Sequence, residues 1–194
     1  MARSKEFDEV KVLSAATEHF WQYGYEATSV RDLADAMGIA GASLYNTFGD
    51  KKSLYRRSLD HYIENSFAER SKRFEAYKSP LQSIVGFFKE IIDLSLRDPQ
   101  RKGCLMVNSA LEVAPHDPEF QRVIADLLIQ AEAFFRRRVE AGHAAGEITT
   151  AHAAKDLARH LLSVLLGIRV LARIRPDRDL LEGLVKPTFT LLNP

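Results

Sequence analysis

Apolar residues recur at helical spacing along nearly the whole chain, and no segment shows the alternation of apolar and polar residues typical of a β-strand. The clearest predicted helix begins at Ser79 and Pro80, because serine caps a helix and proline suits its first position. It is expected to end at Asp98 and Pro99. Its apolar stripe consists of Leu81, Ile84, Val85, Phe88, Ile91, Ile92 and Leu96. The pattern therefore predicts an all-α fold.

Two further helices are predicted in the middle of the chain. A short one follows Gly103 and ends before Pro115. A longer one opens at Asp117 and Pro118. It is expected to end at Gly142, since glycine readily adopts the left-handed conformation that closes many helices.

The last two predicted helices carry more apolar surface than one core can cover. From about residue 151 to 175 apolar residues lie on more than one face, which requires burial on two sides. Pro176 breaks the chain before a final apolar helix. The pair predicts a four-helix interface between two copies, and the alternative is that both helices fill a large core. The expected interface residues are Leu162, Leu166, Ile168, Leu181, Leu184 and Phe189.

The composition is that of a soluble globular protein and gives no overall preference for nucleic acid. The 194 residues are 46% hydrophobic and 27% charged, with a net charge of +1. DNA binding would therefore depend on basic residues gathered on one face. The single cysteine, Cys104, favours a reducing compartment. Since the sequence shows neither a signal-peptide pattern nor an apolar run of membrane length, we expect a cytoplasmic protein with no membrane partner.

Residues 28–54 have the pattern of a helix-turn-helix. Thr28 or Ser29 can cap a first helix, and Gly38 permits the sharp turn before a second. The residues that face outward from the second helix are Ala42, Ser43, Tyr45, Asn46 and Thr47. In DNA-binding proteins such a helix enters the major groove. An ordinary helical hairpin within a core would show the same pattern.

A longer, ordered set of residues resembles the N-terminal domain of the TetR/AcrR repressor family. The matching residues are Val12, Leu13, Ala15, Ala16, Phe20, Gly24, Tyr25, Thr28, Ser29, Ala34, Gly38, Ile39, Leu44, Tyr45, Phe48, Lys51 and Leu54. Weaker similarities at residues 103–108 and 167–173 extend the resemblance over most of the chain. The resemblance implies a helix-turn-helix DNA-binding domain at residues 1–52. It implies a larger helical effector-binding and dimerisation domain at residues 53–194.

The implied function is that of a homodimeric transcriptional repressor. It would bind a near-palindromic operator in double-stranded DNA and be released by a small-molecule effector, with no catalysis and no cofactor. A helical enzyme is one alternative, although the sequence contains no Gly-rich phosphate loop, nucleophile elbow or catalytic-triad pattern. A helix-turn-helix protein that binds another protein is the second alternative.

The resemblance also implies roles for single residues. Tyr45 and Lys51 would contact DNA phosphates. Thr28 or Ser29 would donate to a phosphate at a helix N-terminus, where backbone N–H groups also point outward. The residues expected to read bases are Arg31, Ser43, Asn46 and Thr47.

The sequence departs from the family pattern at two positions. Ala40 stands where the family has serine, so the recognition helix lacks a side-chain cap of about 1 kcal/mol. Thr47 stands where the family favours histidine. Both departures predict a recognition helix that DNA helps to order. Arg3 and Lys5 form either a mobile arm along the DNA or a solvated tail.

An effector pocket is expected between the helices of the C-terminal part, with an apolar lining and a few polar groups. Asn108, Glu112 and His160 are the polar candidates. The alternative for each apolar residue is plain core. The predicted lining residues are Phe88, Ile92, Cys104, Met106, Asn108, Phe134 and His160.

Cys104 follows Arg101 and Lys102 at the expected start of a helix, where positive charge and the helix dipole would favour a thiolate. It is therefore a candidate redox or electrophile sensor, and the alternative is a small buried apolar residue.

Two arrangements resemble metal sites. Glu140 and His143 have the E-x-x-H spacing of di-iron bundles, but that chemistry needs two such pairs. His152, Asp156 and His160 could share a helix face and hold a divalent metal, or form an exposed ion pair. We expect no metal site.

Overall fold

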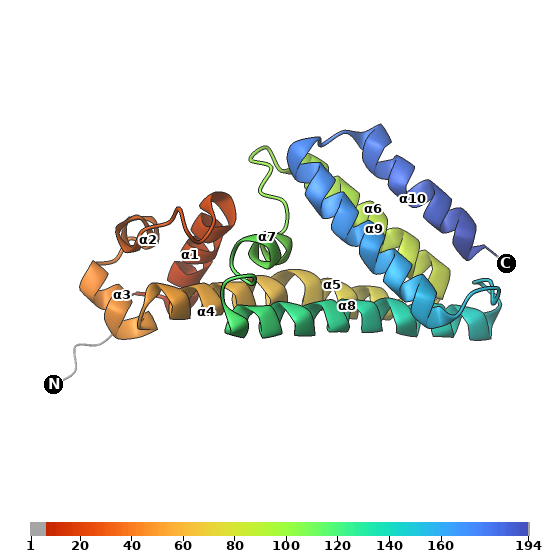
Figure 1. Cartoon of the computed structure of the whole chain (residues 1–194), viewed down its shortest axis with the longest axis horizontal. Helices are drawn as coiled ribbons and strands as arrows, with labels where there is room; N and C mark the ends of the chain where they lie inside the picture. Colours follow the sequence, from red (N-terminus) through yellow and green to blue (C-terminus); the bar gives the residue numbers. More distant parts are fainter. Residues whose placement is uncertain (1–6, 194) are drawn as a thin grey trace.

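The computed structural model describes residues 7–193, and this part of the chain is built from helices without strands (Figure 1). The predicted all-α fold is therefore confirmed, with the N-terminal helix-turn-helix and a larger C-terminal helical part. The helices are α1 (Glu9–Tyr23), α2 (Val30–Met37), α3 (Gly41–Phe48), α4 (Lys51–Ile63), the π-helix η1 (Glu64–Ala68), α5 (Glu69–Glu75), α6 (Pro80–Arg97), α7 (Leu105–Glu112), α8 (Pro118–Ala145), α9 (Ala154–Ile174) and α10 (Arg178–Leu192).

Helices α1, α2 and α3 gather at one end of the molecule, and α6, α9 and α10 at the other (Figure 1). One helical rod, made of α4, η1 and α5 in direct succession, joins the two ends, and α8 runs along its far half. The π-helical turn at Glu64–Ala68 lies in the middle of this rod. Such turns are uncommon and often occur at functional sites.

The described residues form two apolar cores. Phe20, Leu33 and Leu44 belong to the first, which also takes in side chains of α4, α7 and the start of α8. Phe88 and Phe135 belong to the second, between α5, α6, α8, α9 and α10. Because the first core includes residues of α4 beyond position 52, its packing extends past the predicted domain boundary. The division into residues 1–52 and 53–194 remains a prediction.

Local capping signals set the starts of several helices. Ser79 Oγ accepts from the backbone N–H of Gln82 at 3.1 Å, and α6 runs to Arg97 as predicted. Asp117 caps α8 in the same way, through the N–H of Glu119 at 2.9 Å. Among the described helices, none combines the length and the apolarity needed to cross a membrane.

The predicted end of α8 at Gly142 is wrong. The helix continues to Ala145 and closes at Gly146, which has φ +69°. Gly142 instead faces Ile148, whose Cδ1 would lie 2.5 Å from a Cβ at position 142. Close packing against Ile148 therefore accounts for the glycine, and Gly142 does not interrupt the helix between Glu140 and His143.

Candidate functional site

Helix α2 is fixed at both ends by its own sequence. Ser29 Oγ accepts from Asp32 N at 3.1 Å, while Asp32 Oδ2 accepts from Ser29 N at 2.9 Å. The hydrogen bonds that this carboxylate accepts from the hydroxyl and then from the backbone N–H of Ser29 hold the pKa of the Asp32 carboxyl below its usual range. At the other end Gly38, with φ +65°, closes the helix and turns the chain toward α3. The capping and the turn thus agree with the sequence prediction.

Helix α3 buries one face and exposes the other. Leu44 and Phe48 are buried in the first core. Ala42, Tyr45 and Asn46 are exposed, and Ser43 and Thr47 are partly exposed. The predicted outward face therefore lies on the surface, with Tyr45 53% exposed.

The first turn of α3 has no side-chain cap. Ala40 occupies the N-cap position, and only its carbonyl oxygen takes part, accepting from Ser43 N at 2.9 Å and from Leu44 N at 3.1 Å. The absence of a cap, expected from the alanine, is confirmed. The first N–H groups of α3 are consequently open toward solvent or a ligand.

The prediction that Thr28 can reach a phosphate is contradicted by its burial. Its side chain is 1% exposed, and its hydroxyl donates to the carbonyl oxygen of Gly24 at 2.6 Å. Ser29 is exposed, and its hydroxyl donates to Asp32 Oδ2 at 2.6 Å. Of the two adjacent residues only Ser29 lies on the surface.

The basic residues near the motif fall into two groups. Arg31 is exposed, and Lys51 Nζ lies 4.3 Å from the centre of the Tyr25 ring; within residues 7–193 neither has a carboxylate partner. Lys52 instead pairs with Asp117 at 2.7 Å, which raises the pKa of the Lys52 ammonium group. The basic residues after the motif are therefore not all available to DNA, a distinction that sequence proximity alone did not reveal.

Helix α7 contacts the helix-turn-helix directly. Glu112 Oε1 accepts from the backbone N–H of Glu26 at 2.9 Å, and a Cβ at Gly24 would meet the same carboxylate at 2.9 Å. Tyr55 and Ser109 share a buried hydrogen bond of 2.7 Å, and burial raises the pKa of Tyr55 to about 12. Glu112, expected as a pocket residue, thus links the two parts of the molecule.

The predicted pocket residues lie in different parts of the C-terminal helices. Phe88 and Phe134 are buried in the second core. Ile92 lines a separate hollow beside α10. Their positions agree with core packing, the alternative considered for each of the three residues, and their assignment to an effector pocket stays a prediction.

The two polar members of that set are also elsewhere. Asn108 Nδ2 donates to the backbone oxygen of Lys102 at 2.9 Å and so holds the loop before α7. His160 Nε2 lies 3.2 Å from Thr188 Oγ1, between α9 and α10. Cys104 and Met106 line a common cavity, a small space that also contacts Arg169.

Cys104 is 7% exposed and stands at the N-cap of α7. The Tyr62 hydroxyl donates to its Sγ at 3.5 Å. The thiol is accordingly packed in the interior, and a sensor role for it remains a hypothesis. Among the described residues no group of three or more His, Cys, Asp or Glu side chains is placed to hold a metal ion.

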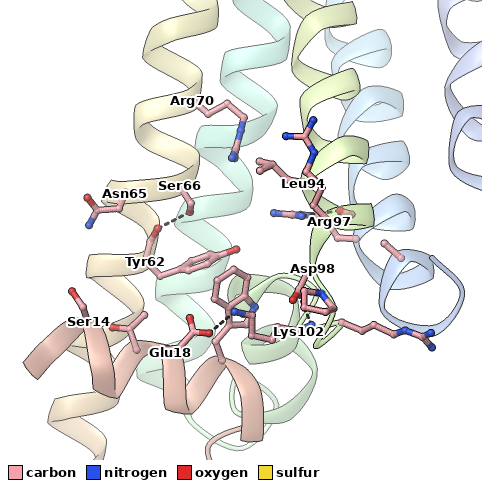
Figure 2. Close-up of a pocket in the computed structure, with 18 of the residues that line it drawn as sticks. Ser14, Glu18, Tyr62, Asn65, Ser66, Arg70, Leu94, Arg97, Asp98 and Lys102 are labelled. Carbon is pink, nitrogen blue, oxygen red and sulfur yellow. Dashed lines mark hydrogen bonds and ion pairs between the residues drawn. The ribbon is translucent and has the colours of Figure 1, made fainter. Parts of the chain in front are cut away.

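A cavity of about 550 Å³ lies where α1 faces the C-terminal part. Its walls come from α1, α4 to α5, the end of α6, the loop before α7, and α9. Figure 2 shows Tyr62 and Arg70 pointing into it from the rod, with Glu18 and Lys102 joined by an ion pair at its lower edge. Sequence reasoning missed this cavity because its walls come from four separate stretches of the chain.

The predicted dimer residues differ in exposure. Ile168 and Leu181 are fully buried within their own chain, so their assignment to an interface is wrong. Leu162, Leu166, Leu184 and Phe189 are partly exposed. Two apolar residues of α9 that the prediction omitted, Val170 and Ile174, are 42% and 74% exposed.

Two family models match the chain. Residues 12–57 match the model of bacterial regulatory proteins of the tetR family. Residues 80–186 match the model of the tetracyclin repressor-like C-terminal domain. Together these models cover the helix-turn-helix and most of the C-terminal part.

Curated relatives and solved structures match along nearly the whole chain. The uncharacterized HTH-type transcriptional regulator YezE of Bacillus subtilis is 39% identical over 100% of both chains. The HTH-type transcriptional repressor ComR of Escherichia coli is 30% identical over 97% of this chain and 90% of its own. A cysteine-substituted form of the TetR family regulator CifR, solved with 26-base-pair operator DNA, superposes with a TM-score of 0.88 at 28% identity. That superposition covers 98% of this chain and 100% of that one.

Proposed function

The chain belongs to the TetR family and is a helix-turn-helix transcriptional regulator, and from this premise we propose a homodimeric repressor of a near-palindromic operator. A small-molecule effector would release it from the DNA. The observation that carries the proposal is the two-faced helix α3, whose polar residues face solvent while Leu44 and Phe48 anchor it in the core. Support comes from CifR, which was solved with operator DNA.

In the proposed complex α3 lies in the major groove. Tyr45 and Lys51 contact phosphates, and the exposed Ser29 stands at the N-terminus of α2, where a phosphate would also bind. Asparagine and arginine side chains can pair with adenine and guanine respectively, so Asn46 and Arg31 are proposed to read bases. The remaining residues proposed to face the bases are Ala42, Ser43 and Thr47.

The proposed dimer uses the outer face of α9 and α10. Val170 and Ile174 present exposed apolar surface there, and a Cβ at Gly167 would meet nothing within 4 Å. A two-fold axis through this face would relate two copies of the chain, so that the dimer presents two α3 helices to the DNA. Reading successive major grooves requires the two α3 helices to stand about 34–36 Å apart.

Release of the repressor from DNA needs only a modest preference of the effector for a dimer in which the two α3 helices stand at a different spacing. A tenfold loss of operator affinity corresponds to about 1.4 kcal/mol of differential binding. The rod of α4, η1 and α5 would transmit the change, since Lys52 ties its start to α8 and Tyr55 ties it to α7.

The test is selection of bound DNA from a random library, with sizing of the complexes. We expect a palindrome bound by a dimer. Lys51→Ala should weaken binding to all sequences and lower the salt slope by about 1, whereas Asn46→Ala should relax the preference at one base pair. Lys89→Ala, an exposed lysine on α6, is the matched control and should bind normally.

The opposite result would be a random library without enrichment at low salt. The alternative of a helix-turn-helix that binds another protein would then replace the operator proposal. An enzyme is not proposed, because both family models describe regulators.

A further inference from the structure

The cavity of about 550 Å³ between α1, α4, α6 and α9 is large enough for a drug-sized ligand. Ser14, Thr17, Glu18 and Trp21 form its α1 wall. A molecule bound there would touch the helix-turn-helix domain itself as well as the C-terminal helices. Its position therefore suits a ligand that alters how the two parts are held together.

Positive charge exceeds negative charge around this cavity. Its lining contains five cationic residues against two acidic ones: Arg70, Arg97, Arg101, Lys102 and Arg169 against Glu18 and Asp98. Both carboxylates are already engaged by neighbouring groups. Glu18 pairs with Lys102, and Asp98 accepts from the backbone N–H groups of Gln100 and Lys102.

Three of these cations have no carboxylate partner within residues 7–193. Arg97 and Arg101 are exposed at the edge of the cavity, whereas Arg169 lies further inside. Arg169 Nη1 donates to Ser95 Oγ at 3.1 Å, and its other polar neighbours are Cys104 and Tyr62. A guanidinium held among uncharged groups loses hydration without a compensating charge, which an anionic ligand would supply.

A second, independent observation is the indole of Trp21. Its Nε1 is buried and has no hydrogen-bond partner within the described chain. Buried N–H donors are nearly always satisfied, so an unpaired one beside a cavity indicates a missing acceptor. Lys102 Nζ lies over the indole ring, 4.4 Å from its centroid.

We propose that this cavity binds a small organic acid, with its carboxylate on Arg169 and an oxygen within reach of the Trp21 indole. Leu94, Pro99 and Ala172 supply apolar wall for the body of the molecule. A guanidinium binds a carboxylate through two parallel hydrogen bonds, which favours it over a neutral amide of the same shape. The proposal rests on the proposed function only in calling this acid the effector.

Trp21 is the only tryptophan in the sequence, so its fluorescence reports on this cavity alone. The DNA-free protein is titrated with 4-phenylbutyrate and octanoate, each against its neutral amide. We expect a saturable change in Trp21 emission with each acid, at least tenfold weaker with its amide and weaker at high salt. Phenyl phosphate is tested in the same way. If it binds as tightly as the carboxylic acids or more tightly, the proposed ligand class changes from a carboxylic acid to a phosphate ester.

Arg169→Gln should weaken acid binding at least tenfold. Arg97→Gln, at an exposed position that leaves the fold undisturbed, should weaken it severalfold, and Arg136→Gln on α8 is the matched control with no effect. Acids that change Trp21 emission no more than their amides, or arginine variants that bind as well as the control, would overturn the proposal. If the acids bind but do not release operator DNA, the proposed binding site is supported and only its role as the effector site is contradicted.

Discussion

Thr28 and Ser29 are neighbours in the chain with opposite environments. Both can cap a helix and both matched the family pattern, but the backbone turn before α2 directs the Thr28 hydroxyl inward to Gly24 and leaves Ser29 exposed. At the scale of the residue, function therefore depends on which of two similar side chains faces solvent.

Thr28→Val should reduce the free energy of unfolding by about 1 kcal/mol, because the partly buried carbonyl of Gly24 loses its donor. Operator affinity of the folded variant should stay unchanged. Denaturant unfolding and operator titration measure the two quantities. A variant that is as stable as the wild type but binds DNA poorly would restore Thr28 as a phosphate contact.

Helix α3 is short, and its N-terminus is uncapped. Ala40→Ser should stabilise the protein by about 1 kcal/mol, since a serine hydroxyl can accept from an N–H of the first turn. If DNA orders the first turn of α3 in the wild type, operator binding should tighten in the variant, because its turn is already ordered. Denaturant unfolding checks the first effect, with Ala36→Ser on the exposed side of α2 as the control that gains no cap. Equal stability of the two serine variants would contradict the expectation.

Helices α5 and α6 are joined through Glu90. Hydrogen bonds from Arg73 and then Arg70 hold the pKa of the Glu90 carboxyl below its ordinary value of 4.5. The stabilisation is therefore complete above pH 4.5 and is lost as the pH falls through the lower folded value. Melting temperatures of the wild type and Glu90→Gln should differ at pH 7 and converge in acid.

The control for that comparison is Glu140→Gln, which removes one carboxylate from the exposed i,i+4 pair with Arg136. It should change the melting temperature little at any pH. A gap between Glu90→Gln and the wild type that stays constant down to pH 3 would show that the carboxylate charge is not its source.

At the scale of the whole molecule, two cores share one rod. Side chains of α4 complete the first core and Phe74 of α5 belongs to the second, so displacement of the rod must disturb both. Contacts of Lys52 and Glu112 then connect the helix-turn-helix to α8 and α7. This shared element is the physical basis for expecting that ligand binding and DNA binding are coupled.

The outer face of α9 gives a prediction for the assembly. Val170→Glu and Ile174→Glu should convert the dimer to a monomer, because each places a charge in the proposed apolar interface. Light scattering after size exclusion measures the mass. Ile129→Glu is the control, since Ile129 is 64% exposed on α8, a helix outside the proposed α9–α10 interface. Monomers produced by the control alone would move the interface to α8.

Helical periodicity, caps at Ser29, Ser79 and Asp117, and the exposed face of α3 could all be predicted from the sequence. These features depend on residues three or four positions apart, which remain neighbours wherever the helix packs. The function could be predicted from the family motif, because its residues lie within one continuous stretch of the sequence and can be recognised without the fold.

Tertiary structure alone decided which residues meet across the chain. It buried Ile168 and Leu181 in the core, set Gly142 against Ile148, and brought Trp21 and Arg169 to one cavity. Periodicity identifies an apolar face but not its partner, because core, pocket and interface all use the same apolar side chains. Only the packing of distant helices distinguishes these three environments.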